Sequence, residues 1–290
     1  MQNITFLKPD NLLEVSRVLI EQKGTAQLAA GCTDVIPALR RELISPQTIV
    51  SLRGIPNLSY VVEDGAVVRI GAMTTMTELA QSPIILAQFP ALAEAADNVG
   101  SRLVQNSATI AGNLCNASPA ADTAPPLLVY GAKVKIFNQG VERELELAQF
   151  FVGHRKTVLQ PGDVVVEIIL PRPEPNTYSV FMKQGRRKAL EISILSVAVK
   201  LTLGSNGDVV KAAIACGAVG PTPVLAKASE KLIGQIITSE EDLVPMLEAL
   251  TAEVAPISDI RGTAEYRKHM VGILTKRAVC QLVTSNGKGV

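Results

Sequence analysis

The most informative stretch of this sequence is SATIAGNLCNASPAAD, residues Ser107–Asp122. Its residues are small, polar and turn-prone, so we expect a loop whose backbone comes close to a ligand rather than a core strand. About eighty residues earlier, the shorter stretch LAAGCTD, residues Leu28–Asp34, also ends in a glycine-bearing loop. The two stretches are therefore the first candidates for a binding site.

Both loops have the chemistry of an anion site. Glycine permits positive φ and close approach, which lets successive backbone N–H groups point at phosphate oxygens. Thr33, Thr109 and Ser118 add hydroxyl groups, and Asn113 adds an amide. Neither loop has the Gly-Lys-Ser/Thr of a P-loop or the GxGxxG of a Rossmann unit. Taken alone, Gly31–Asp34 favours a simple turn over a ligand loop, whereas Thr109–Asp122 is equally compatible with a binding loop and an ordinary connection.

Composition excludes several classes of protein. The chain has 290 residues, and 28 Lys+Arg against 27 Asp+Glu give a net charge of +1. This balance, with 3% aromatic residues, does not predict a nucleic-acid partner. No apolar run is long enough for a membrane span, and the first residues do not resemble a secretory signal. We expect a cytoplasmic protein.

The titratable residues predict neither a metal site nor a catalytic group. The four cysteines are widely scattered, with no C-x-x-C pair, which disfavours zinc and iron–sulfur clusters in this chain. The two histidines, His154 and His269, are far apart in sequence. No residue stands out as a nucleophile or general base.

Hydrophobic periodicity predicts an α+β chain that begins with a β-α-β-like unit ending near Pro56. A helix capped by Asp10 or Asn11 should end at Gly24, and Gln27–Ala30 should run into the first loop. A second helix is expected from Pro37 to about Leu43, and a strand over Thr48–Leu52.

Two further units follow. In residues 57–175 we expect strands at Val67–Gly71, Lys133–Phe137 and Asp163–Leu170, and an alanine-rich helix over Pro90–Val99. Pro171–Pro175 is the best linker candidate. In residues 176–290 we expect strands over Ile192–Leu203 and Val209–Cys216, joined by a hairpin turn at Gly204–Asp208. Two helices should follow, over Glu240–Glu253 and Thr263–Val283.

The two loops resemble the FAD-binding signatures of the flavin subunits of the xanthine dehydrogenase and carbon monoxide dehydrogenase family, usually A-G-G-T-D and T-I-G-G-N followed by S-P-A-x-D. Val219–Pro223, Phe181–Gln184, Leu190–Ile192 and Glu265–Arg267 are similar to segments of that family's C-terminal domain. The resemblance covers nearly the whole chain. It implies a two-part, PCMH-like FAD-binding domain over residues 1–175, with subdomains of about 1–56 and 57–175, and an α+β C-terminal domain over 176–290 with an antiparallel sheet and helices.

The same resemblance implies an FAD site. Residues of both loops should wrap the pyrophosphate, Asp122 with Ser118 should bind ribose or ribityl hydroxyls, and Lys183 should lie near the flavin. The implied cofactor-binding residues are Gln27, Leu28, Ala29, Ala30, Gly31, Cys32, Thr33, Asp34, Thr109, Ile110, Ala111, Gly112, Asn113, Ser118, Asp122, Val164, Val165 and Lys183. For three of them a structural reading stays open: Lys183 as a solvated lysine, and Val164 and Val165 as strand core.

The family reading implies a chain that works only in a complex. A molybdenum-cofactor (molybdopterin) subunit would oxidise the substrate, and a subunit with 2Fe-2S clusters would relay electrons to FAD on this chain. FAD would then reduce an acceptor such as NAD+. The alternatives are a stand-alone flavin NAD(P)H oxidoreductase, or a flavin-free assembly or regulatory protein on the same fold.

Two residues depart from the family pattern. Cys32 stands where the family usually has its second glycine, and Ala111 replaces the first glycine of the Gly-Gly pair. Each residue adds a Cβ where the backbone would approach phosphate. If either position needs positive φ, the strain costs about 1 kcal/mol or more. These departures keep the flavin-free alternative open.

Overall fold

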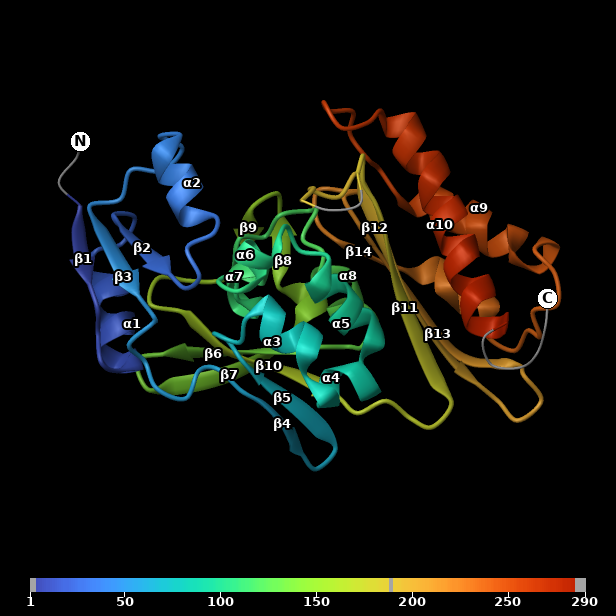
Figure 1. Ribbon diagram of the computed structural model, residues 1–290, viewed down its shortest axis with the longest axis horizontal. Helices are drawn as coiled ribbons and strands as arrows, with labels where there is room; N and C mark the ends of the chain where they lie inside the picture. Colours follow the sequence, from blue (N-terminus) through green and yellow to red (C-terminus); the bar gives the residue numbers. More distant parts are fainter. Residues whose placement is uncertain (1–3, 188–189, 285–290) are drawn as a thin grey trace.

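The computed structural model describes residues 4–187 and 190–284. The three larger sheets follow one another along the long axis of the molecule, in the order of the sequence, and helices lie between and beside them (Figure 1). The predicted α+β class, with an FAD-binding part followed by a C-terminal domain, is confirmed. Among the described residues, no helix is both long enough and apolar enough to span a membrane.

The first sheet is parallel, with strand order β1-β3-β2, and forms the predicted β-α-β unit. Asn11 caps its first helix, because its side chain accepts the Glu14 N–H at 2.9 Å. The second helix starts and ends earlier than expected, and Glu42, with a φ of 55°, follows it. The elements are β1 (Thr5–Leu7), α1 (Leu12–Glu21), β2 (Ala26–Ala29), α2 (Val35–Arg40) and β3 (Thr48–Ser51).

The second sheet is antiparallel, in the order β4-β5-β10-β6-β7. Its predicted members β5, β6 and β10 are confirmed, and the edge strands β4 and β7 were not predicted. The strands are β4 (Val61–Asp64), β5 (Val67–Gly71), β6 (Lys133–Asn138), β7 (Val141–Glu146) and β10 (Val164–Pro171), with a small β8 (Phe151–Gly153) and β9 (Lys156–Thr157) pair beside them. The helices are α3 (Met76–Gln81), α4 (Pro83–Gln88), α5 (Pro90–Asp97), α6 (Arg102–Gln105), α7 (Ile110–Cys115) and α8 (Ala124–Val129).

Helix α7 corrects the expectation of a continuous loop over residues 107–122. Thr109 caps this helix, since its Oγ1 accepts the Gly112 N–H at 3.2 Å. Ile110 and Leu114, four residues apart, are both fully buried and anchor the turn to the core. The small and polar residues of this segment do not predict a helix, and the helix is stabilised by its N-terminal cap and its buried face.

The third sheet is antiparallel, in the order β11-β12-β13-β14, and the predicted hairpin at 204–208 joins β12 to β13. Strand β11 was missed, because its polar and apolar residues do not alternate cleanly. Strand β12 starts at Leu195, three residues later than expected, and a 3-10 turn at Glu241–Leu243 precedes α9. The elements are β11 (Thr177–Gln184), β12 (Leu195–Leu203), β13 (Val209–Gly217), β14 (Val224–Ala226), α9 (Val244–Glu253) and α10 (Ala264–Thr284).

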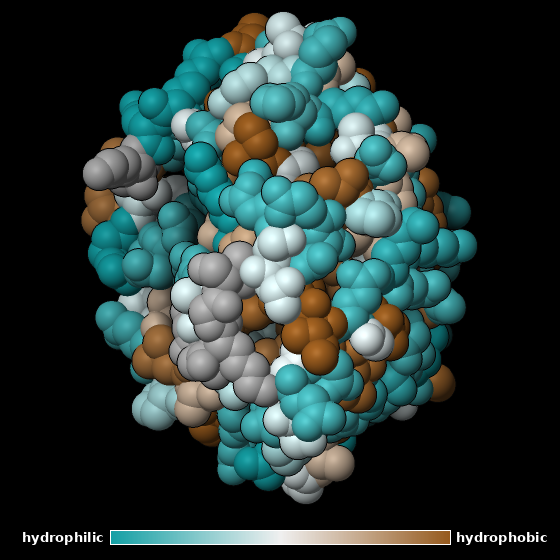
Figure 2. Space-filling model, turned by 90° about the vertical axis from the view of Figure 1, so that its right-hand side faces the viewer, coloured by the Kyte–Doolittle hydropathy of each residue, from teal (hydrophilic) through white to brown (hydrophobic). Residues whose placement is uncertain are grey.

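Helices cover both faces of the third sheet. Helices α5 and α8 pack on the face toward the second sheet, and α10 packs on the other (Figure 1). One core cluster therefore contains Phe181, Ala198 and Ala215 of the third sheet together with residues of α5 and α8. The outer face on the α9–α10 side is mostly hydrophilic, with hydrophobic residues in separate small patches (Figure 2). The domain boundary at residue 175 stays a prediction.

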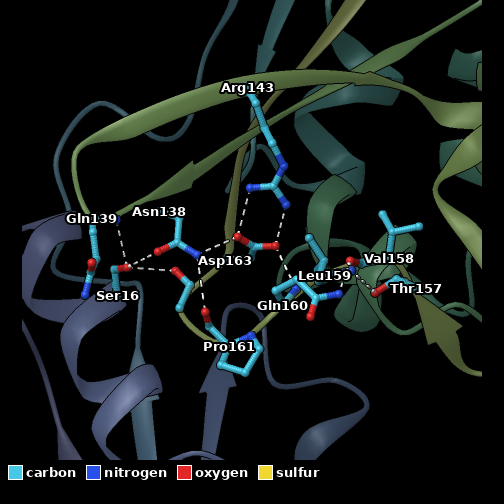
Figure 3. A network of polar contacts seen from close by, with 11 residues as sticks. Ser16, Asn138, Gln139, Arg143, Thr157, Val158, Leu159, Gln160, Pro161 and Asp163 are labelled. Atoms are coloured by element: carbon cyan, nitrogen blue, oxygen red, sulfur yellow. Dashed lines mark hydrogen bonds and ion pairs between the residues drawn. The ribbon is translucent and has the colours of Figure 1, made fainter.

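A buried polar network joins α1 to the second sheet (Figure 3). Ser16 on α1 donates to Gly162 O at 2.8 Å and accepts the Gln139 N–H at 3.0 Å. The Asp163 carboxylate, whose side chain is fully buried, receives both Arg143 Nη atoms, at 2.9 and 2.5 Å. Asn138 Nδ2 donates to the same carboxylate at 2.7 Å. The network fixes α1 relative to the second sheet.

Candidate functional site

The structure brings the two glycine-bearing segments into direct contact. A Cβ added at Gly31 would lie 1.8 Å from the carbonyl oxygen of Ser107 and 3.1 Å from the Cα of Ala108. No side chain fits there, so glycine is required by the approach of the two backbones. The site therefore combines residues that are far apart in the sequence.

The first loop offers unpaired backbone donors. Within the described chain, the N–H groups of Gly31, Cys32, Thr33 and Asp34 donate to no protein acceptor. These four residues form the turn that joins β2 to α2. Partly exposed N–H groups in succession are what a phosphate oxygen needs. This loop can hold an anion.

Cys32 has a φ of 64°, so the family's glycine position does require the left-handed region. Its thiol makes only a weak contact, 3.7 Å from Ala30 O. The strand before it is less exposed: Ala29 is fully buried, and Gln27 turns its amide onto Leu28 O at 2.9 Å. Gln27, Leu28 and Ala30 are half-buried.

The second segment offers side chains rather than free backbone donors. The N–H groups of Ile110 and Ala111 already donate to Thr74 O and Ala72 O, at 3.0 and 3.2 Å. The Gly112 N–H goes to Thr109. The backbone N–H groups of residues 110–112 are therefore already paired within the protein and not free for a phosphate. Ala111 lies buried in α7 with ordinary helical φ, so its Cβ causes no backbone strain.

Two side chains of the second segment have hydrogen-bond donors that are unpaired within the described residues. Asn113 Oδ1 accepts the Thr123 hydroxyl at 2.6 Å, which orients the amide and leaves its NH₂ group unused within the described residues. Thr109 Oγ1 accepts from Gly112, and its own hydroxyl proton has no partner in the described chain. Ser118 shapes the following turn by accepting the Ala120 N–H at 3.3 Å.

Asp122 and Lys183 form a buried ion pair between the two domains. Lys183 Nζ lies 2.7 Å from Asp122 Oδ2, with side-chain exposures of 12% and 7%. Lys183 also donates to Asn98 O at 2.8 Å, and Ser193 donates to Asp122 Oδ1 at 2.5 Å. Burial raises the pKa of Asp122, and the contacts with Lys183 and Ser193 oppose that rise. Lys183 is thus not merely a solvated lysine.

Ser193 and Asn98 contact this ion pair but are not among the residues that the sequence predicts for the site. Ser193 directly follows the family-like segment Leu190–Ile192, and this neighbourhood is the sequence feature that could have predicted its place in the site. Asn98 contributes only a backbone carbonyl, which no sequence pattern marks. Beside Lys183 lies a pocket of about 410 Å³, whose lining includes the exposed pair Arg186 and Arg187. The pocket therefore adds positive charge next to the ion pair.

Val164 and Val165 lie apart from these contacts, on neighbouring positions of β10. Val164 is fully buried in the core with α1, and Val165, at 3% exposure, is buried in the larger core. Successive strand residues face opposite sides, so the two side chains belong to different layers. Protein packing alone accounts for both residues, and their contact with a cofactor stays a prediction.

Two family models match the chain in succession. The model described as the FAD binding domain in molybdopterin dehydrogenase matches residues 2–173, and that of the CO dehydrogenase flavoprotein C-terminal domain matches residues 180–282. Together they cover nearly the whole chain and follow the order that the sequence predicted.

Similar proteins carry the same two parts. A putative xanthine dehydrogenase FAD-binding subunit of Escherichia coli K12 is 31% identical, covering 93% of this chain and 92% of its own. The carbon monoxide dehydrogenase medium chain of Afipia carboxidovorans is 30% identical, covering 94% of each. A solved chain of carbon monoxide dehydrogenase from Hydrogenophaga pseudoflava superposes with a TM-score of 0.91 at 30% identity, covering 96% of each. This chain therefore belongs to the FAD-binding medium subunits of the xanthine dehydrogenase and carbon monoxide dehydrogenase family.

Proposed function

We propose that this chain uses FAD to transfer electrons within a molybdenum-containing hydroxylase or dehydrogenase. The observation that carries the proposal is the loop at 31–34, where four successive N–H groups lack acceptors within the described chain and Gly31 is pressed against Ser107. This arrangement fits a pyrophosphate, because unpaired backbone donors favour an anion. When bound, FAD supplies the redox chemistry by accepting and releasing electrons.

Different residues of the chain would bind different parts of FAD. The N–H groups at 31–34, with the Thr109 hydroxyl and the Asn113 amide, would bind the pyrophosphate. Asp122 would accept hydrogen bonds from ribose or ribityl hydroxyls, and Lys183 would hold that carboxylate ionised and in place. Gln27, Leu28, Ala29, Ala30, Ile110, Ala111, Gly112, Ser118, Val164 and Val165 would shape the walls around these donors.

Electrons would reach this chain from a partner. The similar proteins are named as subunits or chains of xanthine and carbon monoxide dehydrogenases, and the solved Hydrogenophaga enzyme is described as lacking the Mo-pyranopterin moiety of its molybdenum cofactor. We infer a molybdenum-cofactor subunit and an iron–sulfur subunit as partners, an acceptor such as NAD+, and a cytoplasmic location. Rapid reduction of the flavin by organic substrate in the reconstituted complex, and none in the isolated chain, would support this order of transfer.

Flavin binding is tested by replacing Gly31 with alanine. The added methyl group would collide with the Ser107 carbonyl and separate the two loops, so Gly31→Ala should lose most bound FAD. The matched control is Gly272→Ala on α10, where a Cβ meets nothing within 4 Å and FAD binding should be unchanged. Both are measured by the visible flavin absorbance that remains after gel filtration with excess FAD.

The two rival functions give different results in the same preparations. A wild-type chain that stays colourless with excess FAD would favour the flavin-free assembly or regulatory protein. Bleaching of the bound flavin by NAD(P)H in the isolated chain, followed by multiple turnovers with an artificial acceptor, would favour the stand-alone oxidoreductase. Retained flavin that turns over only with the partner subunits supports the proposal.

A further inference from the structure

The end of β13 connects the C-terminal domain to the Ser118–Asp122 segment. Ala218 is buried and has a φ of 59°, a left-handed conformation that is unfavourable for a residue with a Cβ. Its N–H donates to Pro119 O at 2.6 Å. Such a conformation persists only where the surrounding contacts determine it, so another group must hold Ala218 in place.

Arg267, in the first turn of α10, supplies that contact. Its side chain is only 5% exposed, and its Nη1 donates to Ala218 O at 3.2 Å. Its Nη2 lies 2.6 Å from Asp259 Oδ1, as an ion pair without hydrogen-bond alignment. Asp259 is itself fixed by the N–H and the guanidinium of Arg261, at 2.7 and 2.8 Å. Both the N–H and the carbonyl of Ala218 are therefore engaged.

The neighbouring residue shows how closely this strand end packs. A Cβ at Gly217 would lie 2.5 Å from Ser196 Oγ, 3.3 Å from Pro125 Cγ and 3.5 Å from Pro119 O. The strand end thus packs tightly against Pro119, with little free space between them. A change in the backbone of Ala218 would be transmitted to Pro119 and to Asp122, which lies three residues further on.

We propose that Arg267 is a positioning residue for the Ser118–Asp122 segment, acting through the left-handed backbone of Ala218. The proposal rests on the proposed role of Asp122 in the FAD site. Without the guanidinium, Ala218 O loses its donor and Ala218 relaxes out of the left-handed region. Its N–H then turns away from Pro119, and Asp122 loses its alignment with Lys183. The segment Glu265–Arg267, which the family resemblance marks without a role, thereby gains one.

The test combines Arg267→Met with Ala218→Gly. Arg267→Met should weaken FAD binding about tenfold, the typical effect of losing one hydrogen bond to a charged group. Glycine takes positive φ without strain, so adding Ala218→Gly should restore most of the affinity. The FAD dissociation constant is measured by fluorescence quenching on the full chain, beside thermal unfolding of each variant.

A control separates positioning from general stability. Glu42 is another left-handed residue, with a φ of 55°, on the turn after α2. Adding Glu42→Gly to Arg267→Met should raise thermal stability without restoring FAD affinity. Recovery of FAD affinity by Glu42→Gly equal to that by Ala218→Gly would overturn the proposal.

A second readout needs no flavin. Hydrogen exchange in the FAD-free protein should become faster over residues 117–124 in Arg267→Met, stay unchanged over residues 28–34, and return to the wild-type rate with Ala218→Gly. Unchanged exchange over 117–124 would overturn the positioning role. A wild-type chain that binds no FAD would overturn the proposed function instead, and the exchange comparison would still decide the role of Arg267.

Discussion

Cys32 and Ala111 both replace family glycines, and the structure gives them opposite consequences. Cys32 has a φ of 64°, where a Cβ is strained. Ala111 is in the first turn of α7 with ordinary helical φ, where alanine is a favourable residue. The sequence could mark both positions as departures, but only backbone angles separate the strained one from the harmless one.

Replacing Cys32 by glycine should therefore stabilise the chain. Removal of the left-handed strain is worth up to about 1 kcal/mol, and flavin content should be retained or increased. The free energy of unfolding in urea and the flavin absorbance per chain measure the two effects. Cys32→Ala is the matched control, because it removes the thiol and keeps the strain. Loss of flavin in both variants would show that the thiol itself contributes.

At the scale of elements, the joint between α1 and the second sheet depends on one carboxylate. Asp163 precedes β10 and binds Arg143 of β7, Asn138 of β6 and the Gln160 N–H (Figure 3). Burial alone would raise the pKa of Asp163, but the hydrogen bonds from Arg143, Gln160 and Asn138 outweigh burial and lower it. The same turn engages Ser16 through Gly162 O.

This lowered pKa predicts how stability depends on pH. The stabilisation by Asp163 is fully present above the pKa of an unfolded aspartate, and it is lost as pH falls through the lower pKa of the folded state. Asp163→Asn should lower the free energy of unfolding by about 2 kcal/mol at neutral pH and by much less in acid. Urea unfolding at both pH values measures the difference.

The control for this prediction is Glu144→Gln on β7. Glu144 is exposed on the same hairpin as Arg143, so its removal should change stability little at either pH. If Asp163→Asn loses the same stability in acid as at neutral pH, the ionised carboxylate is not the source of the effect.

At the scale of the whole molecule, the C-terminal domain has a core of its own, but one face of its sheet also belongs to the core of the FAD-binding part. Phe181 of β11 is 1% exposed and belongs to the same cluster as residues of α5 and α8. The ion pair of Asp122 with Lys183 crosses the same junction. Contacts of this kind couple the stability of two domains that the sequence presents as separate units.

We therefore expect a single cooperative transition in calorimetry. Phe181→Ala should lower stability by about 3–5 kcal/mol and move the whole transition, because the cavity lies in a shared core. Phe6→Ala is the aromatic control, since Phe6 on β1 is 62% exposed and its loss should have little effect. Two separate transitions, with only one shifted by Phe181→Ala, would contradict the coupling.

The sequence by itself determined the class of the fold, the order of the parts and the family. Periodicity located β5, β6, β10, β12, β13 and the two C-terminal helices, because these elements have long apolar runs or faces. The motifs around Gly31 and Gly112 located the candidate site. The sequence does not predict strand β11 or helix α7, because packing against other elements stabilises them more than local sequence does.

Only the tertiary structure decided how the site is built. Gly31 is required because Ser107, distant in sequence, lies against it, and the N–H groups of Ile110 and Ala111 are occupied by carbonyls of residues 72–74. Composition cannot reveal either fact, since both depend on which backbone lies beside which. The two loops were visible in the sequence, but contacts between distant residues determine which of their donors are free to bind a cofactor.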